Sequence, residues 1–79
     1  MMAKTYPFSA RKHTHDIEFR RNYVFNLMHE GWTGYDKLYK QLTELVSAMC
    51  GGAPVVYLTG KQIQLAKESV AWAAIQRGA

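Results

Sequence analysis

The sequence predicts an all-α fold: a compact three-helix domain with an extended N-terminal arm and a short strand-like connector before the third helix. Apolar residues recur with the helical period over most of the chain. Two glycine-rich breaks, at 31–34 and 51–54, divide this pattern into three segments. We therefore expect a single domain over residues 1–79, with a basic extended arm over 1–13 and a helical core over 14–79.

The first helix is expected to follow the arm directly. Thr14 or Asp16 can serve as its N-cap, and Asp16 and Glu18 suit the positive end of the helix dipole. Gly31 can adopt the left-handed conformation that commonly ends a helix. The predicted core face of this helix carries Ile17, Phe19, Tyr23, Val24, Leu27 and Met28.

The second helix has the clearest pattern in the chain. Thr33 is its expected N-cap, Asp36 takes the third helical position in an acidic variant of the capping box, and Gly51 can close it. Its apolar residues recur at i, i+3, i+4 and i+7 and form one core face, which consists of Tyr35, Leu38, Tyr39, Leu42, Leu45, Val46 and Met49.

The third helix begins at a capping box formed by Thr59 and Gln62. The connector before it, 55–58, is β-branched and aromatic and has strand propensity. The other extended candidate is 5–9, where Pro7 disfavours helix at Tyr6. A two-stranded pairing of arm and connector is thus an alternative, but we favour an unpaired extended segment that packs on the helices.

Two sides of the third helix are apolar, about 160° apart. One side carries Ile63, Ala66, Val70, Ala73 and Ala74, and the other carries Leu65, Ala71, Trp72 and Ile75. A three-helix core needs one of them, so the side with Trp72 needs a cover. Either the connector 55–58 packs on it, or it binds a second protein or a second copy of this chain.

Length and composition exclude several classes of protein. A chain of 79 residues has one core and little structure left for a deep catalytic cleft. A hydrophobic fraction of 48% argues against disorder. No apolar run approaches the ~20 residues of a membrane span, and no export signal is expected. The single Cys50 cannot form an internal disulfide, which favours the cytoplasm.

The net charge of +4 is concentrated near the N-terminus, because residues 1–21 hold five basic and two acidic side chains. This surplus favours an acidic partner. Arg20 falls within the core arc of the first helix, where its alkyl stem can cover the core or its guanidinium can bind a carboxylate or phosphate.

Phe25 lies on the opposite face, between Arg21 and His29 at i−4 and i+4. Either Tyr6 or Phe8 of the arm covers it, or it anchors a binding hot spot. The predicted partner-binding residues are therefore Arg11, Lys12, Arg20, Arg21, Phe25 and Trp72.

No constellation typical of catalysis, of a cofactor site or of a metal site is present. His13 and His15 lack a third ligand at suitable spacing. Cys50 lies at the edge of an apolar helix face, where we expect a small buried side chain rather than a nucleophile. We therefore predict no enzyme activity and no bound cofactor.

The predicted function is that of a small non-enzymatic binding protein, an inhibitor or adaptor that docks on a larger assembly through a basic and aromatic face. The expected partner is an acidic protein surface or a nucleoprotein assembly, and a homodimer through the third helix is possible. In size and general character the chain is similar to phage and mobile-element proteins that block host machinery, anti-CRISPR proteins among them, although no motif carries this likeness.

The alternative function is direct binding of nucleic acid by the basic arm and the first two helices. Two helices joined by a short glycine-containing turn, as expected over 14–50, resemble helix-turn-helix DNA readers. Lys37 and Lys40 could face a groove, but Asp36 and Glu44 share their face and would repel phosphates.

Overall fold

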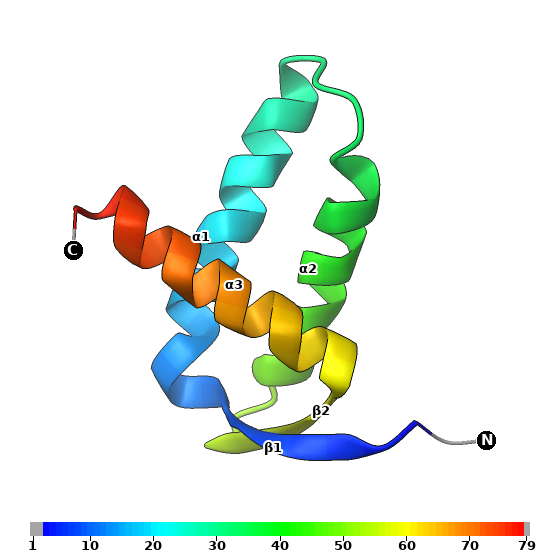
Figure 1. Cartoon of the computed structure of the whole chain (residues 1–79), viewed down its shortest axis with the longest axis vertical. Helices are drawn as coiled ribbons and strands as arrows, with labels where there is room; N and C mark the ends of the chain where they lie inside the picture. Colours follow the sequence, from blue (N-terminus) through cyan, green and yellow to red (C-terminus); the bar gives the residue numbers. More distant parts are fainter. Residues whose placement is uncertain (1–2, 79) are drawn as a thin grey trace.

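Two strands and three helices follow one another along the chain in the order β-α-α-β-α. The computed structural model describes residues 3–78, with β1 (Thr5–Ser9), α1 (Ala10–His29), α2 (Asp36–Met49), β2 (Val55–Thr59) and α3 (Gly60–Gln76). The strands form an antiparallel two-stranded sheet at one end of the helices, and α3 crosses over α1 and α2 (Figure 1). The molecule is flat, with extents of 36 × 33 × 19 Å.

The all-α prediction is wrong, because the arm and the connector pair as β1 and β2. The register sets Tyr6 opposite Leu58 and Phe8 opposite Val56. Leu58 is buried while the neighbouring Tyr57 is exposed, which is the alternation of a strand with one face on a core. A segment that buries every second side chain must also satisfy its backbone polar groups, and a second strand does so. The fold is therefore mixed α and β, dominated by helix.

The predicted arm over 1–13 is also wrong, because α1 begins at Ala10. Ser9 is its N-cap, and the Ala10 amide donates to the carbonyl of Pro54 at 2.9 Å, which extends the strand pairing into the helix start. Thr14 does not cap the helix: its hydroxyl donates to the carbonyl of Ala10 inside the first turn. Asp16 instead forms an ion pair with Arg77, the C-cap residue of α3.

A Schellman motif ends α1, as Gly31 predicts. The amide of Gly31 donates to Met28 at 3.0 Å, and the amide of Trp32 donates to Leu27 at 3.1 Å. Gly31 has a φ of +85°, in the left-handed region where glycine is favoured. This motif fixes the position of Trp32 beside the end of the helix.

The other helix ends agree with the sequence in part. The capping box of α3 is confirmed, because Thr59 Oγ1 accepts from the Gln62 amide at 3.3 Å and Gln62 Oε1 accepts from the Thr59 amide at 3.0 Å. Thr33 does not cap α2, whose N-cap is Tyr35 without a side-chain bond. The glycine with positive φ after α2 is Gly52 rather than Gly51.

The core lies where the three helices and β2 meet. Its buried members are Ala10, Ile17 and Val24 of α1, Leu42, Leu45, Val46 and Met49 of α2, Leu58 of β2, and Ala66 of α3. None of the helices within residues 3–78 combines the length and hydropathy of a membrane-spanning segment.

A stripe of small residues lets α3 lie close to the core. Ala66, Ser69 and Ala73 are fully buried. Ala66 and Ala73 belong to the first predicted face, and Val70 of that face is partly buried beside them. Trp72 of the second predicted face lies on the other side of the stripe and is also partly buried. Because small side chains allow close approach, the larger neighbours reach around them on both sides. The first predicted face is therefore the core face of α3. Of the second face, Leu65 packs against the core and Trp72 packs on α1, whereas Ala71 and Ile75 are exposed.

We expect Gly31→Ala to lower the free energy of unfolding by about 1 kcal/mol, because an L side chain at positive φ is strained. A Cβ at Gly31 meets no atom within 4 Å, so the cost is conformational and not steric. Gly51 is the matched control: it has no neighbour within 4 Å and no positive φ. Gly51→Ala should be neutral or stabilising by about 0.5 kcal/mol. Chemical denaturation measures the free energy of unfolding of both variants, and equal changes would show that the positive φ of Gly31 imposes no extra cost on alanine.

Candidate functional site

The most distinctive surface feature is an aromatic cluster where α1 and α3 cross. The Trp72 ring lies against Phe19 and Tyr23 of α1, with ring centroids 5.7 and 4.8 Å apart. The guanidinium carbon of Arg20 lies 5.8 Å from the centre of the Trp72 ring. We call Phe19, Arg20, Tyr23 and Trp72 the Trp72 patch.

Helical spacing places these α1 side chains on one side. Phe19 and Tyr23 are four residues apart and therefore lie one above the other along the helix. Asp16, one turn earlier, pairs with Arg77 and ties the C-terminal end of α3 to α1. That pair is charge-neutral, so Arg20 contributes the net positive charge beside the rings.

The Trp72 patch remains open to solvent. Phe19 and Tyr23 are 42% and 44% exposed, although Trp72 itself is partly buried. Exposed rings next to an arginine have the composition of binding hot spots, in which a large apolar area combines with a directional charged donor. The arrangement can bind an acidic and apolar surface, and the guanidinium is partly held by its contact with Trp72.

Phe25 belongs to a different surface, between α1 and α2. Its ring contacts His29 at 4.3 Å and Tyr39 of α2 at 5.8 Å between centroids, and it is 43% exposed. Tyr6 and Phe8 do not cover it, because β1 lies at the opposite end of α1 (Figure 1). Tyr39 is its partial cover instead.

Two shallow grooves near the C-terminal end of α1 share Met28. One, of about 250 Å³, is lined by Phe25, Met28, His29 and Tyr39. The other, of about 470 Å³, follows the turn between α1 and α2 and includes Trp32, which is 58% exposed. We call Phe25, Met28, His29, Trp32 and Tyr39 the Phe25 patch.

The six predicted contact residues therefore do not form one face. Arg20 and Trp72 come together on the side of α3, whereas Arg21 pairs with Glu18 at 3.8 Å and Phe25 faces α2. Consecutive helical residues differ by about 100° in direction, so Arg20 and Arg21 face different neighbours. Arg11 and Lys12 are exposed in the first turn of α1.

The N-terminal basic charge is spread out and not gathered in one place. Lys4 lies above the Tyr6 ring at 5.5 Å, before β1. The strand then carries the chain about 3.3 Å per residue, so Arg11 follows on α1 roughly 20 Å further along the chain. The arm thus presents separate charges at the two ends of β1.

Phe19 and Tyr23 were missed as contact residues because their spacing assigned them to the core. Their signal was present: two aromatic residues at i and i+4, each next to an arginine in sequence or on the helix surface. Trp32 and Tyr39 could not be identified as surface contact residues from the sequence, because Trp32 falls in the expected turn and Tyr39 on the expected core face of α2.

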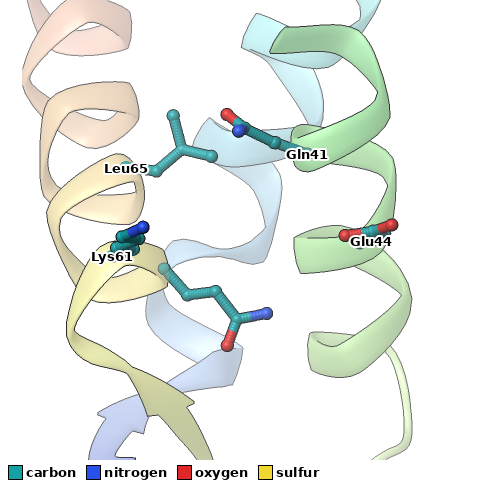
Figure 2. Close-up of a pocket in the computed structure, with 5 residues that line it drawn as sticks. Gln41, Glu44, Lys61 and Leu65 are labelled. Atoms are coloured by element: carbon teal, nitrogen blue, oxygen red, sulfur yellow. The ribbon is translucent and has the colours of Figure 1, made fainter. Parts of the chain in front are cut away.

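A small cleft between α2 and the start of α3 is lined by polar side chains and Leu65. Gln41 and Glu44 approach it from α2, and Lys61 and Leu65 from α3 (Figure 2). Its volume is about 150 Å³, below the ~300 Å³ at which small-molecule sites begin. Gln62, the remaining lining residue, is already engaged in the capping box. The cleft is therefore smaller than typical small-molecule binding sites.

Groups with catalytic or metal-binding chemistry lie apart. Cys50 is exposed, which corrects the expectation that it is buried: it is the C-cap of α2 and begins an exposed connection to β2. His13 packs on Phe8 with centroids 5.2 Å apart, while His15 is exposed. Within residues 3–78 no three His, Cys, Asp or Glu side chains come close enough together to hold a metal ion.

Comparison with protein-family models, with curated proteins and with solved structures finds no match to this chain.

We expect Trp72→Ala to lower the free energy of unfolding by about 3 kcal/mol, because it removes the ring that joins α1 to α3. Trp32→Ala is the matched control: the same atoms are removed from a side chain that is 58% exposed. Its cost should stay below about 1 kcal/mol. Urea denaturation followed by circular dichroism measures both, and a loss for Trp72→Ala as small as the one expected for the control would show that Trp72 is not a packing residue.

Proposed function

We propose that the protein is a small non-enzymatic binding protein that docks on a larger partner through the Trp72 patch, as an inhibitor or adaptor. The observation that supports this most directly is the contact of Arg20 with Trp72 beside two rings that are each more than 40% exposed. Exposed aromatic area of this kind costs solubility unless it is covered by a partner.

The charge of the patch indicates the partner's chemistry. Arg20 supplies a guanidinium that can form two parallel hydrogen bonds to a carboxylate. Lys12, exposed two turns earlier on α1, and the overall charge of +4 add long-range attraction for an acidic surface. The favoured partner is therefore an acidic protein surface, alone or within a nucleoprotein assembly of the kind that phage proteins block.

The proposal assigns the protein to the cytoplasm. Cys50 is the single cysteine of the chain and its thiol is exposed, so a reducing compartment would protect it from forming disulfides with other molecules.

The test compares Arg20→Glu with Lys37→Glu, an equal charge change on the exposed polar face of α2. Each tagged variant is used for affinity capture from the source cell with quantitative mass spectrometry. We expect the partner captured by the unchanged protein and by Lys37→Glu to be lost with Arg20→Glu, with its Kd raised about 30-fold or more. Capture of the same partner by all three proteins would contradict the proposal, provided that circular dichroism shows all three folded.

The alternative of direct nucleic-acid binding gives a different result. Fluorescence anisotropy with plain duplex and single-stranded DNA would then show salt-dependent binding, and Arg20→Ala would reduce the salt slope by about 1. If the proposal holds, the chain binds duplex and single-stranded DNA no more tightly than other cationic proteins do. Nuclease treatment of the lysate then leaves capture of the protein partner unchanged.

A further inference from the structure

The strand β2 has one unpaired edge, whose backbone groups the register identifies. The bond from the Ala10 amide to Pro54 marks a hydrogen-bonded pair, and such pairs recur at every second residue, at Phe8 with Val56 and at Tyr6 with Leu58. The amides and carbonyls of Val55 and Tyr57 consequently point away from β1.

The two edges of the sheet differ in how well they are protected. At the outer edge of β1, Pro7 removes the central donor, which is a common device against edge-to-edge pairing. The edge of β2 has no such device: residues 51–60 contain no charged side chain, and β2 itself contains neither Pro nor Gly. In composition β1 is an edge strand and β2 is a central strand.

One outward amide of β2 is already bound. Gln62 Oε1 accepts from the Thr59 amide, within the capping box of α3. Among the described residues no backbone or side-chain hydrogen bond reaches the amides of Val55 and Tyr57 from outside the sheet. A partner strand therefore has two donors and their two carbonyls to bind.

We propose that this edge binds the β2 strand of a second copy of the chain, antiparallel and centred on Val56. In that register Val55 of each copy faces Tyr57 of the other, and four hydrogen bonds use every free donor of both edges. Thr59 needs no partner, so both capping boxes stay intact. The product is a four-stranded sheet in which each outer strand is β1, with its proline at the edge.

A second copy fits this edge better than an unrelated strand because the edge is complementary to itself. The two-fold axis through Val56 sets each free amide opposite a free carbonyl of the identical strand. It also sets Val55, 43% exposed, beside the 69% exposed Tyr57 of the other copy, an aromatic and β-branched pair that stabilises neighbouring strands. No charge on either strand opposes the pairing. This inference is independent of the Trp72 patch.

The test measures molar mass by size-exclusion chromatography with light scattering over about a hundredfold range of concentration. We expect the unchanged chain to form a dimer that dissociates on dilution. The double variant Val55→Lys with Tyr57→Lys sets like charges opposite each other and should raise the dimer Kd about tenfold or more. Ile75→Lys, at a 68% exposed position of α3, is the control and should leave the Kd unchanged.

A rescue separates the pairing from any loss of folding. The variant with Glu at both positions should also be monomeric, and mixing it with the double lysine variant should restore a mixed dimer. Hydrogen exchange of the unchanged protein adds a second measurement: the amides of Val55 and Tyr57 should be protected only at high concentration, whereas that of Thr59 should be protected at all concentrations. A chain that is monomeric throughout, or a double lysine variant that still forms the dimer, would overturn the inference.

Discussion

The antiparallel pairing of β1 with β2 determines where the helices lie. Each strand leads directly into a helix, β1 into α1 at Ala10 and β2 into α3 at Gly60. Because the strands are antiparallel, these helices leave the sheet at opposite ends of a ribbon about 17 Å long. From its end of the ribbon, α3 runs back across α2 and α1 (Figure 1). The crossing brings Trp72 to Phe19 and Tyr23.

Local signals in the sequence predicted the three helices but not the sheet. The capping box at Thr59, the stop at Gly31 and the apolar face of α2 depend on neighbouring residues alone, and the structure has all three. The pairing of Tyr6 with Leu58 joins distant parts of the chain, and its stability depends on packing that no local pattern encodes. The start of α1 was misplaced for the same reason, since the strand pairing, and not a side-chain cap, fixes Ala10.

The candidate site was predictable in its residue types and not in its grouping. Arg20, Phe25 and Trp72 were singled out from the sequence as partner-binding residues, which stays a prediction, but a helical wheel does not tell which neighbouring helix packs on which side. Arg20 faces α3 and Phe25 faces α2, so the structure divides one predicted face into two. The prediction of two competing apolar faces on α3 has a similar cause. The buried stripe of small residues around Ser69 gives a weaker hydrophobic signal in the sequence than the large side chains on either side of it.

The 19 Å thickness of the molecule has a thermodynamic consequence. In so thin a domain few large side chains are fully buried, and the contact of α1 with α3 at Trp72 is a substantial part of the packing. A partner that bound the Trp72 patch, as proposed, would contact α1 and α3 in the native state and not in the unfolded chain. It would add RT ln(1 + [L]/Kd) to the free energy of unfolding, about 2.7 kcal/mol at a hundredfold excess over Kd. For a chain of 79 residues this is a large share of the total stability. Under the proposed function, recognition and folding would thus be linked equilibria, and the melting temperature would report on the occupancy of the Trp72 patch.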